Sequence, residues 1–269
     1  MSSTESIIDD KKPNAGRIYD YLLGGYHNFE IDRQAAKQVL ARLPFMSKFV
    51  RLQRWSLQDL AEELTIRRGY EVIVDFASGL PTNDHIHHKV SPDTTVIYSD
   101  YDPTVVEYAW EILKSDHPNT HFFQADASHP AELLERPEVQ QILSGRRKVA
   151  FVYWGVSIFL PDDSIKRAAH ELYDWAAPGS CLAFNAQGAD INTDYPGGDQ
   201  IVELYARMGT PLYPRSLAHY KELIQPWHID GEFIPLLKWH GFEENLLNDE
   251  DTTAYGPMGG GYGVYLLKP

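Results

Sequence analysis

The chain has 269 residues, of which 38 are Asp or Glu and 24 are Lys or Arg, so its formal net charge is −14. This acidic balance argues against a nucleic acid or an anionic membrane surface as the principal partner. Hydrophobic residues make up 43% of the chain and charged residues 23%, which are ordinary values for a globular protein and exclude a disordered, collagen-like or coiled-coil chain.

The sequence also indicates where the protein is located. The single cysteine, Cys181, cannot form an internal disulfide bond, which is typical of a reducing compartment. The acidic start of the chain lacks the basic and apolar regions of a secretory signal. The most apolar stretch, residues 149–160, is shorter than the roughly 20 residues that a helix needs to cross a bilayer. We therefore expect a cytoplasmic protein that does not bind a membrane.

The first elements expected along the chain are helices. Apolar residues recur at helical spacing over residues 18–23, 32–43 and 45–66. The third stretch ends at Arg67-Arg68-Gly69, two cations followed by a glycine, a combination that typically ends a helix. We predict an N-terminal helical cap over residues 15–66.

Residues 71–185 alternate between β-rich apolar runs and longer amphipathic runs, the pattern of βαβ units on a parallel sheet. Strands are predicted over residues 71–75, 95–99, 120–124, 149–153 and 180–184. Amphipathic helices are predicted over residues 103–115 and 164–175. The expected fold class is therefore α/β, with a doubly wound core over residues 71–185.

The rest of the chain is punctuated by proline and glycine. Helices are predicted over residues 200–208 and 216–224, within a late insertion (186–235) that is placed to cover a pocket. Two last strands are predicted over residues 239–247 and 263–267, within residues 236–269, and the glycine-rich residues 256–263 are interpreted as a hairpin connection. We expect residues 1–269 to form a single domain.

The first predicted strand ends in an acid and a turn of small residues. Asp75 is followed by Ala77-Ser78-Gly79 and then by Pro81, where a helix is expected to begin. Small residues let backbone amides approach a ligand closely, and a carboxylate at a strand end receives a ligand cation.

Two further strands end in the same way. Asp100 ends the second strand, 21 positions after Gly79, and an acid placed there accepts hydrogen bonds from ribose hydroxyls. Asp126 and Ala127 follow the third strand, where a carboxylate and an amide N–H suit an adenine ring. Because open α/β sheets bind ligands at the carboxyl ends of their strands, these residues predict one nucleoside-binding crevice. Since a strand-end acid supports little packing, we expect Asp100→Ala to fold normally.

The turn distinguishes between nucleoside ligands. A dinucleotide requires G-x-G-x-x-G, and the turn at residues 77–82 lacks the last glycine. S-adenosylmethionine has no phosphate and carries an ammonium, a carboxylate and a sulfonium, which suits Asp75 and Asp100 better. A nicotinamide-dependent oxidoreductase is the weaker alternative.

Several motifs resemble one known family. They are RIYDYLLGGYHNFEIDR over residues 17–33, GLPT over 79–82, DYDP over 100–103, LPDD over 160–163 and APGS over 177–180. Together they resemble the class I methyltransferases, specifically the S-adenosyl methyltransferase family, long catalogued only as a domain of unknown function.

The resemblance implies a Rossmann-like fold with a seven-stranded, mostly parallel sheet whose last strand is antiparallel. It also implies an enzyme that transfers a methyl group from S-adenosylmethionine to a small-molecule acceptor and releases S-adenosyl-L-homocysteine. The N-terminal segment would fold over the cofactor. The cofactor-binding residues expected from the motifs and the strand ends are Tyr19, Gly24, Gly25, Asn28, Asp75, Ala77, Ser78, Gly79, Asp100, Tyr101, Asp126, Ala127 and Trp154.

Two residues depart from the family's pattern. Ala77 replaces the usual first glycine of the turn, at a cost of roughly 1 kcal/mol if the residue needs a positive φ. Ile158 stands where many relatives have a histidine, so a general base is absent at that position. These departures motivate an alternative function, a non-catalytic regulatory protein that binds a nucleoside or S-adenosylmethionine.

No catalytic residue is assigned, but four aromatic side chains are candidates for the methyl-transfer site. Tyr153 and Trp154 follow the fourth strand, and Tyr26 and His27 lie in the N-terminal segment. Aromatic faces stabilise cations such as a sulfonium. Packing in the core accounts for Tyr153 equally well.

Two other clusters have ordinary explanations. Residues 84–88, with the sequence DHIHH, have the spacing of metal ligands on a helix, but no second group of ligands accompanies them, so we interpret them as surface histidines and predict no metal site. A group of aromatic residues indicates an apolar or aromatic acceptor, or else packs the insertion. These residues are Tyr213, Tyr220, Trp227 and Trp239.

Overall fold

A computed structural model describes residues 11–82, 84–113, 118–190, 198–239 and 261–269. Its centre is a seven-stranded sheet in the order β3-β2-β1-β4-β5-β7-β6, in which β7 runs antiparallel to β5 and β6. The strands are β1 (Val72–Phe76), β2 (Thr95–Asp100), β3 (Thr120–Gln124), β4 (Ala150–Tyr153), β5 (Cys181–Ala186), β6 (His228–Pro235) and β7 (Tyr262–Leu267). The predicted α/β class and the antiparallel last strand are confirmed.

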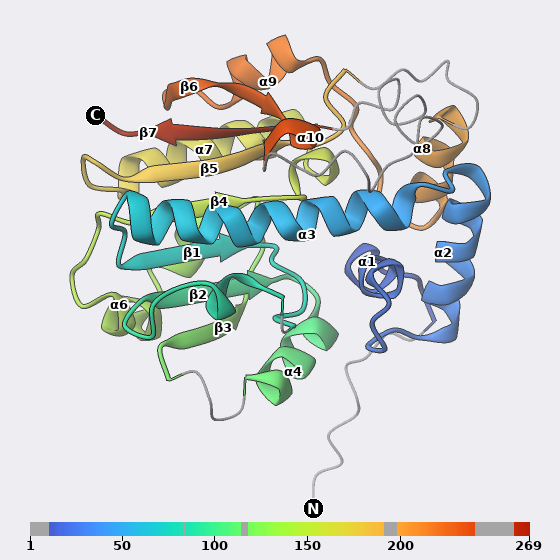
Figure 1. Cartoon of the computed structure of the whole chain (residues 1–269), viewed down its shortest axis with the longest axis horizontal. Coiled ribbons are helices and arrows are strands. Elements are labelled where there is room, and N and C mark those ends of the chain that lie inside the picture. The colour runs from blue at the N-terminus through green and yellow to red at the C-terminus, as the bar shows by residue number, and fades with distance from the viewer. Residues whose placement is uncertain (1–10, 83, 114–117, 191–197, 240–260) are drawn as a thin grey trace, which may run out of the picture.

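Helices cover both faces of the sheet. The helices before the sheet are α1 (Ala15–Leu23), α2 (Glu30–Arg42) and α3 (Met46–Glu62), which continues as the π-helical turn η1 (Glu63–Arg67). The helices that follow the first strand of the sheet are η2 (Ile86–His88), α4 (Pro103–Ile112), α5 (Pro130–Leu134), α6 (Pro137–Leu143), η3 (Ser157–Phe159), α7 (Asp162–Trp175), α8 (Gly198–Arg207), α9 (Leu217–Leu223) and α10 (Leu236–Trp239). In Figure 1, α3 crosses one face of the sheet, while α1, α2 and α8 lie beyond the carboxyl ends of the parallel strands.

Side chains alternate between the two faces along each strand, and this alternation decides which residues meet α3. In β1, Ile73 packs in the core that includes α1 to α4, whereas Val72 and Val74 pack in the core that includes α5, α6, α7 and α9. Asp75 therefore shares the α3 face with Ile73. After β4 the same alternation places Trp154 on the α3 face and Tyr153 on the other.

A buried charge network fixes the N-terminal cap to the sheet. The Arg17 guanidinium donates to Asp32 at 2.8 Å and to Asp102 at 3.0 Å, and all three residues are buried. Asp102 also caps α4 by accepting from the Thr104 N–H at 2.8 Å. Because Arg17 and Asp32 belong to the N-terminal motif, part of that motif serves to hold α1 and α2 against the end of β2.

The sixth strand was predicted wrongly. β6 occupies His228–Pro235, inside the range assigned to the insertion, and Trp239 lies in α10. Charged residues and Gly231, which has a φ of +83°, interrupt the apolar pattern, and the pairing with β7 shifts register between Asp230 and Ile234. This irregularity removes the alternation by which a strand is recognised. Residues 240–247, and the hairpin connection up to residue 260, lie outside the described residues.

A second difference concerns the segment after β1. No helix begins at Pro81 in the described residues. The next helical element is η2, one turn of 3-10 helix that begins at Ile86. Thr82 donates from its hydroxyl to Asp84 at 2.8 Å, a local bond that competes with helix formation. None of the helices in the described part of the chain is long and apolar enough to cross a membrane.

Candidate functional site

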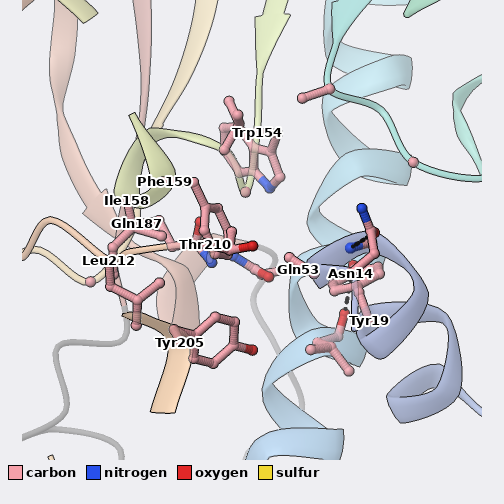
Figure 2. A pocket seen from close by; sticks show the side chains of 18 of the residues that line it. Asn14, Tyr19, Gln53, Trp154, Ile158, Phe159, Gln187, Tyr205, Thr210 and Leu212 are labelled. Carbon is pink, nitrogen blue, oxygen red and sulfur yellow. Dashed lines mark hydrogen bonds between the residues drawn. The ribbon is translucent and has the colours of Figure 1, made fainter. Parts of the chain in front are cut away.

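A cavity of about 480 Å³ lies at the carboxyl ends of the parallel strands. This volume is within the usual range for small-molecule sites, about 300–1,000 Å³. Its lining comes from the strand ends, from α1, from α3 as far as Leu57, and from η3, α8 and residues 209–212. α1 and α3 pack together on one side, where the Tyr19 hydroxyl donates to the Val50 carbonyl at 3.1 Å. In Figure 2, Asn14 and Tyr19 face Ile158, Gln187 and Leu212 across the cavity, with Gln53 between them.

The turn after β1 brings backbone to the cavity. Ala77 has a φ of +53° and Gly79 a φ of +65°, both in the left-handed region that glycine adopts most readily. Ala77 thus has the positive φ on which the expected cost of replacing glycine depended. A Cβ at Gly79 would meet no atom within 4 Å, so the cavity is open to a ligand at this residue.

Asp100 ties this turn to the end of β2. Its carboxylate accepts from the Gly79 N–H at 3.1 Å and from the Asp102 N–H at 3.0 Å. Burial raises the pKa of Asp100 to about 6, against the lowering effect of these hydrogen bonds. The prediction that Asp100→Ala folds normally is at odds with this structure, because the substitution leaves two backbone N–H groups without their acceptor.

The end of β3 and the start of α1 enclose the same part of the cavity. The Asp126 carboxylate accepts from the Ser128 N–H at 2.8 Å, and both Asp126 and Ala127 line the cavity. Tyr101 is 55% exposed, and its hydroxyl accepts from Asn14 Nδ2 at 3.3 Å. The N-terminal cap therefore closes over the strand ends where a nucleoside is expected.

Two buried ionisable side chains beside the turn each have polar atoms without a hydrogen-bond partner among the described residues. Asp75 is 1% exposed and its Oδ2 is unpaired, and Arg54 of α3 is 3% exposed with Nε and Nη1 unpaired. Asp84 comes closest to pairing with Arg54, with 3.9 Å between Asp84 Oδ1 and Arg54 Nε. Burial raises the pKa of Asp75 well above its usual range, although the Arg54 cation opposes this.

Arg54 lines the cavity, whereas Asp75 does not line it but lies two residues before Ala77, which does. The two side chains are close enough for the Arg54 cation to act on the Asp75 carboxyl, so a ligand in this part of the cavity meets groups of opposite charge. The ammonium and carboxylate of an amino acid are such a pair. S-adenosylmethionine carries both at one end, and the residues present therefore fit this cofactor. Sequence reasoning missed Arg54, which lies on the same helix face as Val50 and Leu57, both of which also line the cavity.

Two of the three histidines after Pro81 are buried, so the prediction of surface histidines was wrong for these two. His85 is fully buried and His87 is 7% exposed. His85 Nδ1 accepts from the Ile86 N–H at 2.9 Å, so its Nε2 carries the proton and donates to the Ser78 carbonyl at 3.1 Å. His85 thereby supports the turn from behind, and burial lowers its pKa. Within the described ranges, no group of three His, Cys, Asp or Glu side chains could hold a metal ion.

Many of the predicted cofactor-binding residues line the cavity, but not all of them do. The predicted residues that line it are Tyr19, Ala77, Ser78, Gly79, Asp100, Tyr101, Asp126, Ala127 and Trp154. The predicted cofactor residues outside its lining are Gly24, Gly25, Asn28 and Asp75. Of the candidates for the methyl-transfer site, Trp154 alone belongs to the lining, and Tyr26, His27 and Tyr153 do not.

The glycine pair and the asparagine of the N-terminal motif form the end of α1 rather than the pocket wall. Gly24 has a φ of +89° and ends the helix, and a Cβ at Gly25 would lie 2.1 Å from Asp20 Oδ1. Asn28 Nδ2 donates to Asp20 Oδ2 at 2.8 Å and to the Gly25 carbonyl at 3.0 Å. These contacts require the residue types that the motif contains.

Three aromatic candidates lie elsewhere. Tyr26 is 84% exposed, and His27 packs between Tyr26 and Tyr108, with ring centroids 4.3 and 5.0 Å away. Tyr153 faces the opposite layer and its hydroxyl donates to the Ala127 carbonyl, so core packing explains this residue. Trp154 is held in the cavity wall by a 2.8 Å hydrogen bond from its Nε1 to Ser56 Oγ.

The four aromatic residues proposed to surround the acceptor, Tyr213, Tyr220, Trp227 and Trp239, do not line the cavity. Tyr220 and Trp227 are buried in the core opposite α3, and the Trp239 ring packs against the Trp154 ring at a tilt of 57°, with ring centroids 5.1 Å apart. Tyr213 lies under the Arg215 guanidinium. Sequence reasoning missed many apolar and aromatic residues that line the cavity: Leu43, Phe45, Met46, Phe49, Val50, Ile158, Phe159, Ile201, Tyr205 and Leu212.

Comparisons with known proteins identify the family and the fold. The model of the S-adenosyl methyltransferase family matches residues 1–261. A candidate methyltransferase from Thermobifida fusca YX is 26% identical, with a TM-score of 0.83 over 97% of this chain and 96% of that chain. A DUF574 family protein from Streptomyces avermitilis MA-4680 is 25% identical, with a TM-score of 0.84 over 97% and 99%. No curated protein matches the chain.

A more distant structure shares the fold alone. Magnesium protoporphyrin IX methyltransferase from Synechocystis PCC 6803, solved with bound S-adenosylhomocysteine, is 10% identical, with a TM-score of 0.50 over 94% of this chain and 93% of that chain. The sheet order is thus that of the Rossmann-like class I methyltransferases, and the family match favours S-adenosylmethionine over a nicotinamide cofactor. The chain belongs to the S-adenosyl methyltransferase family.

Proposed function

We propose that the protein transfers the methyl group of S-adenosylmethionine to a small, mainly apolar molecule held between α3, η3 and α8. The observation that carries this proposal is the division of one cavity into two halves. The charged lining residues Arg54, Asp100 and Asp126 lie near the ends of β1, β2 and β3. In Figure 2 the apolar side chains of Ile158, Phe159 and Leu212 lie across the cavity from Asn14 and Tyr19.

The strand-end half is assigned to the cofactor. Asp75 would bind the ammonium and Arg54 the carboxylate of the amino-acid end, since both have unpaired buried atoms. Asp100 would accept from the ribose hydroxyls, and Asp126 with Ala127 would bind the adenine. These contacts explain why the sequence keeps buried charges that cost stability in the unliganded protein.

The cofactor, when bound, supplies an electrophilic methyl group on a sulfonium. The residues of this chain hold the acceptor beside it and exclude water, which is where much of the rate of such a displacement originates. Trp154 belongs to the wall of the cavity, and its ring is fixed by Ser56, so it presents a rigid aromatic surface to the site. Ile158 also lines the cavity, and its apolar side chain contributes packing where relatives would offer a base.

Methyl transfer itself is the test. The protein is incubated with S-adenosylmethionine labelled in its methyl group and with a panel of uncharged aromatic hydroxyl and amine compounds, and label is measured in the organic phase. The proposal predicts transfer to at least one compound of the panel. Binding of the cofactor without transfer to any compound would instead support the non-catalytic regulatory alternative that Ala77 and Ile158 motivated.

The proposed location is the cytoplasm. Cys181 lies buried in β5, and burial raises its pKa to about 12, so the thiol is protected from oxidation. A reducing compartment suits a chain with this single cysteine. Fractionation of cells that express the protein is the direct test.

A further inference from the structure

The face of α3 that lines the cavity is mostly apolar, but it includes the amide of Gln53. Phe49, Val50 and Leu57 line the cavity, and each lies three or four positions from Gln53, on the same side of the helix. Gln53 also lines the cavity, and Figure 2 shows its side chain in the middle of it. Because an amide in apolar surroundings costs free energy unless it is hydrogen bonded, the partners of Gln53 are informative.

A hydrogen-bond network fixes which way this amide points. Asn185, which is fully buried in β5, accepts at Oδ1 from the Gly155 N–H at 3.3 Å and donates from Nδ2 to the Tyr262 carbonyl at 3.0 Å. Since a backbone N–H can only donate and a carbonyl can only accept, these two bonds define the orientation of the Asn185 amide. Gln53 therefore presents its Nε2 to Asn185 Oδ1, at 3.4 Å, and its Oε1 is left for another partner.

The Gln53 Oε1 atom is accessible from the cavity. It accepts no hydrogen bond from the described residues, and it does not belong to their fully buried polar atoms without a partner. Tyr205 and Thr210 also line the cavity, but a hydroxyl can either donate or accept. An amide oxygen can only accept, so Gln53 favours a ligand that carries an O–H or N–H group.

The position of Gln53 in the sheet favours the methyl acceptor over the nucleoside of the cofactor. The residues proposed to bind the ribose and the adenine lie at the ends of β2 and β3, whereas the neighbours of Gln53 are Gly155, after β4, and Asn185, in β5. In the sheet order, β4 and β5 lie on the other side of β1 from β2 and β3. Gln53 thus lies beyond the nucleoside part of the proposed cofactor site.

Gln53 is also linked to the aromatic wall of the cavity. Its backbone carbonyl accepts from the Ser56 hydroxyl at 2.7 Å, and the same hydroxyl accepts from Trp154 Nε1 at 2.8 Å. Trp154 lines the cavity, so a molecule that donates to Gln53 lies close to a large aromatic ring. Such a ring favours an apolar or aromatic body on the bound molecule.

We infer that Gln53 is a specificity residue for the methyl acceptor, and that the acceptor donates a hydrogen bond from a hydroxyl or an N–H group to Gln53 Oε1. This inference rests on the proposed function, because it places the acceptor in the half of the cavity beyond the cofactor. It adds the polar group that a mainly apolar acceptor must carry, and the residue that recognises it.

The test uses protein saturated with S-adenosylhomocysteine and two matched pairs of probes, 2-naphthol with 2-methoxynaphthalene and indole with 1-methylindole. In each pair, the second compound lacks the hydrogen-bond donor and keeps the ring. The variants Gln53→Met and Gln53→Leu remove the acceptor oxygen at similar volume and leave the Gly155 N–H bonded to Asn185. The control is Gln141→Met, at an exposed glutamine on α6. Affinities are measured by calorimetry, and thermal unfolding identifies the variants that fold.

For the unsubstituted protein, the compound with the donor should bind about tenfold more tightly in at least one pair, because its methylated counterpart leaves Gln53 Oε1 without a partner. In the Gln53 variants this preference should fall to within about twofold, whereas Gln141→Met should keep it. The added methyl group is the same for every protein, so a change in preference reports the hydrogen bond and not the size of the probe. S-adenosylhomocysteine should bind the Gln53 variants within about threefold of the parent.

Four results would overturn the inference. They are no binding of 2-naphthol or indole, equal binding within both pairs, an unchanged preference in a folded Gln53 variant, or a folded Gln53 variant that binds S-adenosylhomocysteine more than about tenfold more weakly. The last result would assign Gln53 to the cofactor. In all four, S-adenosylhomocysteine binds the unsubstituted protein, so the proposed cofactor site stands. If S-adenosylhomocysteine does not bind that protein, the proposed function fails, and the inference fails with it.

Discussion

Arg54→Met should make the unliganded protein at least as stable as the parent while it weakens cofactor binding. The Arg54 guanidinium is 3% exposed, and two of its nitrogens lack a hydrogen-bond partner among the described residues. Methionine fills similar space without a charge that needs hydration. The substitution gives up the 3.9 Å ion pair with Asp84, whose side chain is 45% exposed, and such pairs contribute about 0–1 kcal/mol.

The loss in affinity can be worked from the same geometry. A hydrogen bond between charged groups contributes about 1.5–3 kcal/mol, and about 1.4 kcal/mol corresponds to tenfold in affinity. Arg54→Met should therefore weaken S-adenosylhomocysteine binding by roughly 10- to 100-fold. Removal of an unsatisfied buried donor should offset the lost ion pair, so the free energy of unfolding should stay constant or rise by about 1 kcal/mol.

Calorimetry with S-adenosylhomocysteine and urea unfolding of the unliganded protein measure the two effects. Arg51→Met is the matched control, because Arg51 lies on the same helix but is exposed to solvent. It should change neither quantity. The reasoning is refuted if Arg54→Met binds within twofold of the parent, or if it loses more than about 2 kcal/mol of stability, the range of a destabilising core substitution.

Three further predictions concern other residues of the site and the cap. S-adenosylhomocysteine should bind about tenfold more weakly for each pH unit below pH 6. The reason is that the pKa of Asp100 is raised to about 6, and the carboxyl must ionise to accept from both ribose hydroxyls. Asp100→Asn should flatten this part of the pH profile measured by calorimetry. Ala77→Gly should raise the urea midpoint by the equivalent of about 0.5–1 kcal/mol, since it relieves a φ of +53°, and an unchanged or lower midpoint would show that this turn is unstrained. Arg17→Met should cost about 3–5 kcal/mol in urea unfolding by leaving Asp32 and Asp102 buried without their cation, whereas a loss below about 1 kcal/mol would contradict the importance of this network.

Much of the sheet could be predicted from the sequence, because its parallel strands are short apolar runs bounded by turns. The predicted acids at the ends of β1 and β2 lie at the same sheet edge, since β1 and β2 are paired in register. β6 was not predicted at its observed position, because its bulge at Gly231 and its charged residues disrupt the alternation of apolar and polar residues by which a strand is recognised.

The site was harder to predict where it depends on contacts between distant segments. Gly24 and Asn28 belong to a conspicuous motif, yet their role is to close the end of α1 around Asp20. Arg54 carries no local signal, because its importance lies in buried nitrogen atoms that have no hydrogen-bond partner among the described residues, and this burial emerges only when α3 packs beside the strand ends. Alternation along a strand could have excluded Tyr153, since Trp154 and Tyr153 necessarily face opposite layers.

A crystal structure of the complex with S-adenosylhomocysteine tests the central claim most directly. The account predicts that the amino-acid end lies between Asp75 and Arg54, that the ribose hydroxyls donate to Asp100, and that the sulfur faces the apolar half of the cavity that contains Trp154 and Gln53. A ligand bound with its amino-acid end away from Arg54, or with its sulfur turned away from that half, would contradict it.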